Sequence, residues 1–305
     1  MATQTEIFDS FRGELIAAGV LIETGVSGLY GRSGEFEDVI DGLNRLIAGA
    51  AAADAPVRLR FPPIIDRATY EATDHLSSFP DLMGAIHGFR GAGAEHNALR
   101  AAFEDGQDWA AMLSTTDLML CPAACYPVYP TLREQAIEAT GRIFDVVGYC
   151  FRHEPSPDPA RMQSFRMHEN IFVGSAANAL AFRDGWIDRG LDLLRSLGLD
   201  VRAEVANDPF FGRPGRMLKA NQVEATLKYE LVAPIASAAY PTAIASANCH
   251  LDHLTTPFDV CLEDGTRAQS ACVGFGLERV ALALLKCHGL AVSRWPASVR
   301  STLHL

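Results

Sequence analysis

The segment Phe151-Arg-His-Glu-Pro-Ser-Pro-Asp-Pro-Ala-Arg-Met-Gln-Ser-Phe-Arg-Met-His-Glu-Asn-Ile-Phe-Val173 predicts two β-strands joined by a polar loop. Because side chains alternate between the faces of a strand, Arg152 and Glu154 are expected to share one face, and so are Phe165 and Glu169 on the return strand. A guanidinium can grip a phosphate, a ring can stack on a base, and a carboxylate can hold an amine or a metal. The hairpin therefore suits a nucleotide, and the alternative is a solvated face with a surface ion pair.

A second segment, Gly274-Phe-Gly-Leu-Glu-Arg279, opens a predicted helix over residues 277–288. Its glycines allow close approach of the backbone, and Arg279 lies in the first turn of a helix whose dipole favours anions. The third glycine of a dinucleotide fingerprint and the lysine of a P-loop are both absent. A phosphate tail fits here, and the alternative is tight packing of a strand against a helix.

Composition limits the class of protein. The chain has 305 residues, of which 49 % are hydrophobic and 21 % charged, so it can bury a large core. Lysine and arginine number 26 and aspartate and glutamate 37, which gives a net charge of 26 − 37 = −11. This sign disfavours a protein whose affinity comes from neutralising many phosphates of a nucleic acid.

Hydropathy and cysteine usage indicate a cytoplasmic protein. The most apolar run, residues 231–247, is interrupted by Pro234 and Pro241, so no membrane span is expected. The first residues, Met-Ala-Thr-Gln-Thr-Glu, lack the apolar region of a secretory signal. The seven cysteines have no framework spacing, which favours buried thiols and a few metal ligands over disulfides.

The order of elements predicts the fold class. Apolar periodicity predicts helices over residues 1–18, 35–53, 176–197 and 277–288. Strands are expected over residues 57–61, 199–205 and 243–248, whereas residues 224–232 fit a strand or a helix. Residues 74–107 are irregular, and short elements around a site are expected there. Strands that do not alternate regularly with helices predict an α+β fold, an antiparallel sheet flanked by helices, as a single catalytic domain over residues 1–305.

Three segments together resemble the signature motifs of the class II aminoacyl-tRNA synthetases. The strand that ends at Pro62-Pro63 resembles motif 1, the hairpin resembles motif 2, and the glycine-rich helix start resembles motif 3. The resemblance implies a homodimer formed through motif 1. It also implies an ATP site in which Arg152 holds the α-phosphate and the amino-acid carboxylate, Glu154 lies by the adenine amino group, Phe165 stacks on adenine and Arg279 holds the γ-phosphate.

The same resemblance implies further contacts with ATP. Arg161 and Met162 fall in the motif 2 loop near the nucleotide. The family strand that touches ATP and magnesium corresponds here to Ala243, Ile244, Ala245 and Ser246. Arg152 and Arg279, together with Mg²⁺, are expected to offset the charge that develops on the α-phosphate and on the departing pyrophosphate, which makes them the catalytic residues.

A cysteine segment narrows the resemblance. Cys125-Tyr-Pro-Val-Tyr129 is similar to a Cys-Glu-Pro-Phe-Tyr segment of the atypical archaeal seryl-tRNA synthetases, with tyrosine in place of the glutamate. Glu169 corresponds to a glutamate ligand of that family, and Cys272 precedes the motif 3 glycines. The resemblance implies one Zn²⁺ held by Cys125, Glu169 and Cys272, with a fourth position open for the substrate amine. On this interpretation Glu169 and Arg152 contact the amino acid.

Other cysteines are competing metal ligands. Cys249-His250-x-x-His253 has plausible local spacing for a metal, and Cys121 lies four residues before Cys125. Any of these cysteines could also be a buried thiol without a ligand.

The chain also resembles the bacterial amino acid:[carrier protein] ligases, because motif 1 begins near residue 57 and no tRNA-binding domain is evident. The resemblance implies that glycine, or alanine, is activated by ATP to an aminoacyl-adenylate and transferred to the phosphopantetheine thiol of a carrier protein, without tRNA. The adenylate is already an acyl donor, so no protein nucleophile is required. Two alternatives are a seryl-tRNA synthetase-like enzyme that acts on tRNA and a catalytically inactive paralogue that binds nucleotide.

An acidic carrier protein needs a local basic surface on an acidic enzyme. The strongest basic cluster in the sequence consists of Arg213, Arg216, Lys219 and Lys228. It is expected to dock the carrier, and the alternative is an ordinary solvated loop and helix face.

Overall fold

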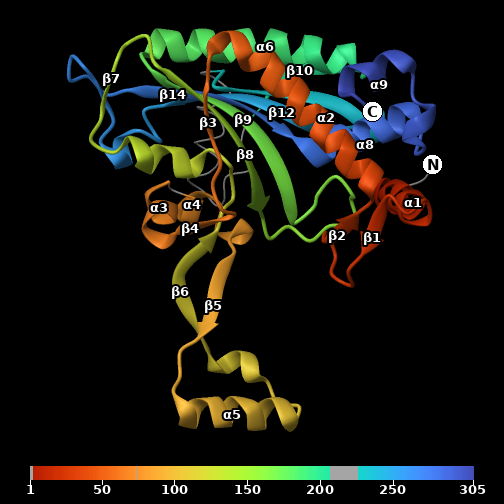
Figure 1. The fold of residues 1–305 in the computed structure, drawn as a ribbon, viewed down its shortest axis with the longest axis vertical. Helices are drawn as coiled ribbons and strands as arrows, with labels where there is room; N and C mark the ends of the chain where they lie inside the picture. The colour runs from red at the N-terminus through yellow and green to blue at the C-terminus, as the bar shows by residue number, and fades with distance from the viewer. Residues whose placement is uncertain (1–2, 74, 207–225) are drawn as a thin grey trace.

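A seven-stranded sheet forms the centre of the computed structural model, which describes residues 3–73, 75–206 and 226–305 (Figure 1). Its strands lie in the order β10 (Arg202–Val205), β11 (Lys228–Ser237), β12 (Tyr240–Leu251), β14 (Gln269–Gly276), β9 (Ser164–Gly174), β8 (Arg142–Phe151) and β3 (Val57–Leu59). Neighbouring strands are antiparallel except β3, which is parallel to β8. The expected α+β class and its antiparallel sheet are confirmed, with one parallel edge strand that the pattern did not predict.

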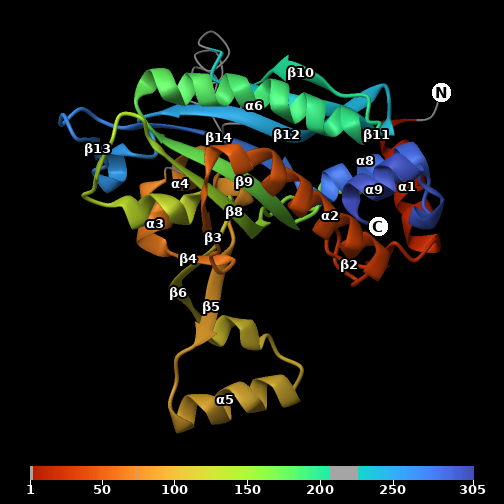
Figure 2. The ribbon, with the colours of Figure 1, turned by 45° about the horizontal axis from the view of Figure 1, so that its top comes forward.

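Helices cover one face of this sheet (Figures 1 and 2). They are α1 (Gln4–Ala17), α2 (Gly34–Ala51), α6 (Ala176–Ser196), α8 (Leu277–His288) and α9 (Ala297–Leu303). Large buried side chains, among them Phe36, Leu43, Trp186 and Phe275, fill the space between helices and sheet. The helices predicted over residues 1–18, 35–53, 176–197 and 277–288 are confirmed, because their apolar faces follow the helical period.

Short segments cover the opposite face of the sheet. They include the 3-10 helices η4 (Tyr126–Leu132) and η5 (Thr256–Phe258) and the parallel pair β7 (Ala136–Ile137) and β13 (Cys261–Leu262). A second core lies here, with Tyr129, Ile171 and Phe258 fully buried. Cys125 and Cys272 belong to this core, so two of the predicted metal ligands lie on the face of the sheet that the large helices leave uncovered.

An arm projects from the body of the molecule (Figures 1 and 2). It starts near α3 (Arg67–Ala72), α4 (His75–Ser78) and η2 (Pro80–Leu82), and it consists of the antiparallel sheet β4 (Ile64–Asp66), β6 (Leu113–Leu120) and β5 (Ala85–Phe89), with η3 (Trp109–Met112) and α5 (Gly93–Glu104) at its far end. Residues 74–107 therefore contain short elements, as predicted. Only their first part lies by the motif 2 hairpin, where the His153 amide donates to the Leu82 carbonyl at 3.0 Å.

Strand boundaries differ from the prediction at several points. The strand expected over residues 57–61 ends at Leu59, and the one expected over residues 199–205 begins at Arg202. Residues 243–248 lie inside the longer β12, and the ambiguous stretch that ends at residue 232 is strand from Lys228 onward. A hairpin of β1 (Leu21–Glu23) and β2 (Tyr30–Arg32) was not predicted, because three-residue strands are too short to show a period.

The described residues also bear on the membrane and disulfide predictions. In the part of the chain that the structure covers, no helix combines the length and the apolar composition of a membrane span. The apolar run of residues 231–247 forms strands β11 and β12 instead. All seven cysteines are described, and each has a free thiol.

Candidate active site

The predicted hairpin is formed by β8 and β9, which pair from Arg142 with Val173 to Phe151 with Ser164. Arg152 and Glu154 lie beyond the end of β8, in the connecting loop, so the strand alternation that was expected to put them on one face does not apply to them. The loop closes where the Arg152 amide donates to the Gln163 carbonyl at 2.9 Å. On β9, Phe165 packs against the second core and Glu169 contacts Ala124 on the same side of the sheet.

Arg152 lies against the aromatic ring expected to bind adenine. Its guanidinium carbon is 5.5 Å from the centre of the Phe165 ring, and its Nε donates to the Pro122 carbonyl at 3.2 Å. A guanidinium over a ring face is held by the ring quadrupole. The two residues to which the resemblance assigns the phosphate and the base are therefore neighbours.

The motif 2 loop carries its own ion pairs. Arg161 donates to Glu154 across the loop and lies 3.9 Å from an Asp158 carboxylate oxygen. Both Arg161 and Glu154 are substantially exposed, so they can exchange these partners for a ligand. Met162 is buried in the helix-side core, and its sulfur accepts from Arg32 at 3.5 Å.

Arg279 joins three segments at the start of α8. Its Nε donates to the Ala160 carbonyl at 2.8 Å and its Nη1 to the Ala243 carbonyl at 3.0 Å. Burial, and then the positive charges of Arg161 and Arg152, lower the pKa of Arg279 to about 10. Three arginines thus share one region, which favours a polyanion.

The strand segment expected to contact ATP is divided between core and surface. Ile244 and Ala245 are buried in the helix-side core, whereas Ala243 and Ser246 are partly exposed. Any contact of the two buried residues with a nucleotide would therefore come through their backbone. Ser246 pairs with Gly274 of β14, and its hydroxyl accepts from Asn248 at 3.2 Å.

The three predicted zinc ligands come together beside this region. The Cys125 side chain hydrogen-bonds to those of Cys272 and Glu169, and a Glu169 carboxylate oxygen accepts from the Ala124 amide at 2.9 Å. Burial and then Cys272 raise the pKa of Glu169 to about 7. The hydrogen bond with Cys125 holds the pKa of Cys272 well below its usual value, while that of Cys125 is raised. Cys125, Cys272 and Glu169 are therefore a buried group of two thiols and a carboxylate that are linked by shared protons.

Gly274 makes room for this cluster. It pairs with Glu169 in the sheet, and a Cβ at this position would lie 2.9 Å from Met167 Cε and 3.3 Å from Glu169 Cγ. The glycine predicted to allow close backbone approach therefore accommodates the side chains of β9.

The competing metal ligands do not all lie by the predicted zinc ligands. His250 joins the predicted cluster, with its Nε2 3.2 Å from Cys272 Sγ. Cys249 is buried one residue earlier on β12, and neighbouring side chains of a strand point to opposite faces. Cys121 donates to the Ala123 carbonyl at 3.0 Å, and burial raises the pKa of its thiol to about 12.

As the side chains stand, no three His, Cys, Asp or Glu residues in residues 3–73, 75–206 and 226–305 form a group arranged to hold a metal. Hydrogen bonds instead link Cys125 with Cys272 and Glu169. The donor chemistry fits zinc, because two thiols, a carboxylate and a nearby imidazole are the ligands that Zn²⁺ takes in proteins. Metal binding would replace the shared protons.

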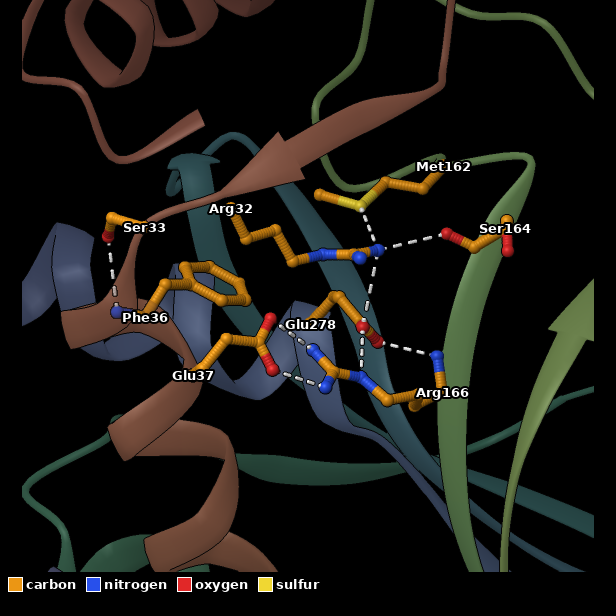
Figure 3. A network of polar contacts seen from close by, with 8 residues as sticks. All are labelled: Arg32, Ser33, Phe36, Glu37, Met162, Ser164, Arg166 and Glu278. Atoms are coloured by element: carbon orange, nitrogen blue, oxygen red, sulfur yellow. Dashed lines mark hydrogen bonds and ion pairs between the residues drawn. The ribbon is translucent and has the colours of Figure 1, made fainter. Parts of the chain in front are cut away.

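A network of four charged residues was missed by the sequence analysis (Figure 3). We call it the Arg166 cluster, and it consists of Arg32, Glu37, Arg166 and Glu278. Glu278 lies within the quoted motif 3 segment but had no assigned role, and no local pattern connects it with residues from three other elements.

Two further polar residues lie by the site. Tyr70 and His75 are buried, their rings meet edge to face at 5.2 Å, and the positive charge of Arg152 acts on both. Burial, and then Arg152, lower the pKa of His75 to about 4, so its imidazole is neutral at pH 7.

The structure describes only one residue of the predicted docking cluster, Lys228. Arg213, Arg216 and Lys219 lie outside the described residues. Lys228 is buried at the start of β11, and its Nζ lies 3.3 Å from a Glu230 carboxylate oxygen. Its charge is therefore balanced inside the fold, and the expectation that it forms part of a basic surface is wrong.

Comparisons with solved structures identify the fold. The Methanopyrus kandleri seryl-tRNA synthetase in complex with A. aeolicus tRNASec superposes with a TM-score of 0.82 at 19 % identity, over 96 % of this chain and 60 % of the synthetase. The Pyrococcus horikoshii seryl-tRNA synthetase complexed with ATP gives a TM-score of 0.72 at 14 % identity, over 97 % of this chain and 62 % of that one. The class II aminoacyl-tRNA synthetase fold is confirmed, and the chain spans about three fifths of these synthetases.

Sequence comparisons identify the family, although no family model matches the chain. Type-2 serine–tRNA ligase of Methanopyrus kandleri is 24 % identical over 59 % of this chain and 37 % of its own length. Amino acid–[acyl-carrier-protein] ligase 1 of Bradyrhizobium diazoefficiens is 41 % identical, over 92 % of this chain and 86 % of its own. Ligase 2 of the same organism is 42 % identical over 291 residues, which are 95 % of this chain and 87 % of the relative. The chain therefore belongs to the amino acid–[acyl-carrier-protein] ligase family of class II synthetase-like enzymes.

Proposed function

We propose that this enzyme uses ATP to activate glycine, or alanine, as an aminoacyl-adenylate and then transfers the aminoacyl group to the phosphopantetheine thiol of a carrier protein. The observation that carries the proposal is that Arg152, Phe165 and Arg279 lie together, beside the buried side chains of Cys125, Glu169 and Cys272. Arginines suited to phosphates and a ring suited to a base thus lie near thiols and a carboxylate suited to an amine or a metal, which supports the proposal. The carrier-protein ligases that the chain resembles over most of its length support the choice of acceptor.

In the first step, formation of the aminoacyl-adenylate, the arginines would stabilise negative charge. The amino-acid carboxylate attacks the α-phosphorus of ATP, which forms a carboxyl–phosphate bond and releases pyrophosphate. Arg152 offsets the charge that grows on the α-phosphate, and Arg279 offsets that of the departing pyrophosphate, with Mg²⁺ bound to ATP. Adenine would stack on the Phe165 ring in place of Arg152, and the partly exposed Glu154 would exchange Arg161 for the adenine amino group.

In the second step the thiol sulfur attacks the adenylate carbonyl carbon. A carbon–sulfur bond forms, the bond to the phosphate oxygen breaks, AMP leaves and the thiol proton passes to a base. The adenylate is already activated, so no covalent intermediate with the protein is needed.

We also propose that Cys125, Glu169 and Cys272 hold one Zn²⁺. Such an ion would supply a Lewis-acidic position for the substrate amine. The supporting observation is that the three side chains are buried and that Cys125 hydrogen-bonds to both Cys272 and Glu169, with His250 beside Cys272. Glu169 would then fix the amino end of the substrate and Arg152 its carboxylate, which favours a small α-amino acid bound at both ends.

We make two further proposals, the first from the likeness to synthetases and the second from the cysteines. Homodimerisation would use the edge strand β3 and Pro62-Pro63, where the sheet ends. The free thiols support a reducing, cytoplasmic location.

Glycine-dependent exchange of pyrophosphate into ATP tests activation without the acceptor. Exchange with glycine or alanine, and little with larger amino acids, is the expected result. Absence of exchange with every amino acid would support an inactive paralogue. A charging assay that offers tRNA and a phosphopantetheinylated carrier protein side by side then tests the acceptor, and aminoacylation of tRNA in place of the carrier would overturn the proposal.

A further inference from the structure

The Arg166 cluster lies where the sheet ends and α8 begins (Figure 3). The ladder between β14 and β9 ends with the pair Gly276 and Met167, because the chain turns into α8 at Leu277. Arg166 is the next residue of β9 beyond that pair. Its amide donates to Glu278 Oε2 at 2.7 Å, so a carboxylate takes the place of the missing strand partner.

Glu278 also binds the side chain of Arg166. Arg166 Nε donates to Glu278 Oε1 at 2.8 Å, and Glu278 is only 2 % exposed. A charged pair that shares two hydrogen bonds in a buried setting has a well-defined geometry. The return strand of the hairpin and the first turn of α8 are therefore held together by one carboxylate.

This link lies one residue from each of two proposed ATP ligands. Phe165 immediately precedes Arg166, and Arg279 immediately follows Glu278. Neighbouring Cα atoms are about 3.8 Å apart across a trans peptide, so the link fixes the backbone directly beside both ligands. The distance between the ring and the Arg279 guanidinium must match the distance between adenine and the terminal phosphate of ATP.

Residues from the N-terminal part of the chain complete the cluster. The Glu37 carboxylate of α2 accepts hydrogen bonds from both terminal nitrogens of Arg166, at 2.5 and 2.9 Å. Arg32 of β2 lies 3.4 Å from Glu278 Oε1 and donates to the Ser164 carbonyl at 3.1 Å. Two positive and two negative charges balance each other, and removal of one would leave an uncompensated charge in a largely buried place.

We propose that Glu278 is a positioning residue for ATP, acting through Arg166 and supported by Glu37. It sets the span between Phe165 and Arg279, so that adenine and the γ-phosphate of one nucleotide are bound at once. This inference rests on the proposed function, because it takes ATP as the ligand.

Binding of ATP and of AMP to the full chain, measured by calorimetry, tests the proposal. AMP contacts only the adenine end and the α-phosphate, whereas ATP also reaches Arg279. Glu278→Gln keeps the shape but loses the charge, and we expect the Kd of ATP to rise about tenfold, as for the loss of one charge-assisted hydrogen bond, while that of AMP changes less than about twofold. Equal weakening of ATP and AMP is what a merely structural role predicts, and it would overturn the proposal.

A second variant covers the case in which Glu278→Gln does not fold. The Glu37 side chain is 41 % exposed, so Glu37→Gln is expected to fold and to raise the Kd of ATP about threefold, again with AMP unchanged. The matched control is Glu204→Gln on edge strand β10, which removes an exposed ion pair with Arg202. Wild-type ATP affinity in folded Glu37→Gln and Glu278→Gln overturns the positioning role, whereas failure of the unaltered chain to bind ATP overturns the proposed function.

Discussion

The guanidinium of Arg152 covers the ring of Phe165, with its central carbon 5.5 Å from the ring centre. The proposed phosphate ligand therefore lies on the ring on which adenine is proposed to stack. If ATP binds as proposed, adenine takes the place of Arg152 on that ring.

The first prediction concerns this ring. Phe165→Ala removes the stacking surface and is expected to raise the Kd of ATP by about 5- to 150-fold, because base stacking on an aromatic contributes about 1–3 kcal/mol. Phe165→Tyr keeps the ring and should bind nearly as well as the parent. Calorimetric titration with ATP measures both, and Phe103→Ala, a ring 70 % exposed at the far end of the arm, is the control. Unchanged affinity in Phe165→Ala would show that adenine binds elsewhere.

A second prediction concerns the start of α8. Arg279→Met removes the charge proposed to stabilise pyrophosphate, and glycine-dependent exchange should fall by about two orders of magnitude. Arg279→Lys keeps the charge but loses the fork geometry, so an intermediate rate is expected. Arg12→Met, which breaks an exposed ion pair on α1, should exchange like the parent. Thermal melting of each variant separates loss of activity from loss of fold, and full exchange by a folded Arg279→Met would contradict the assignment.

A third prediction concerns the metal. The purified chain is expected to contain about one zinc per protomer by elemental analysis, and Cys272→Ser should lose it. The control is Cys287→Ser, because Cys287 is exposed on α8 away from the cluster. A chain that contains zinc but keeps it in Cys272→Ser would place the ion in another site.

A fourth prediction concerns the residues predicted to dock the carrier protein, which lie outside the described part of the chain. Arg216→Glu with Lys219→Glu should reduce transfer to the carrier protein by about tenfold or more and leave ATP–pyrophosphate exchange unchanged, because only the second step uses the carrier. The control is Arg202→Glu, an exposed arginine of edge strand β10. Equal loss of both reactions would indicate a role in folding or in the active site.

A fifth prediction concerns acid stability. Asp145 is buried, which by itself raises its pKa, but hydrogen bonds from His168 and Arg60 outweigh burial and hold the pKa below its usual 3.8. A depressed pKa stabilises the folded chain above pH 3.8, and this contribution is lost as the pH falls through the folded-state value.

Asp145→Asn should therefore lower the free energy of unfolding by about 3 kcal/mol at pH 7, with a smaller difference from the parent at about pH 3. Urea denaturation at both pH values measures the difference. A constant difference would show that packing, and not ionisation, is what Asp145 supplies.

Local sequence patterns predicted much of the fold. The helices over residues 35–53 and 277–288 could be predicted because an apolar face repeats every three or four residues whatever the rest of the chain does. Arg152 and Arg279 could be proposed as ATP ligands because the motifs that contain them, residues 151–173 and 274–279, are each contiguous. Arg152 and Glu154 nevertheless proved to be loop residues, since a strand's end depends on its partner strand and not on its own composition.

The sequence by itself determined the main helices and the order of the three motifs, because each of these is encoded within a few neighbouring positions. Only the tertiary structure decided that Lys228 is buried against Glu230, that His250 joins Cys272, and that Glu278 replaces a strand partner of Arg166. These contacts join residues from 2 to 112 positions apart, and the balance of burial and charge that selects them exists only once the sheet and its helices have assembled.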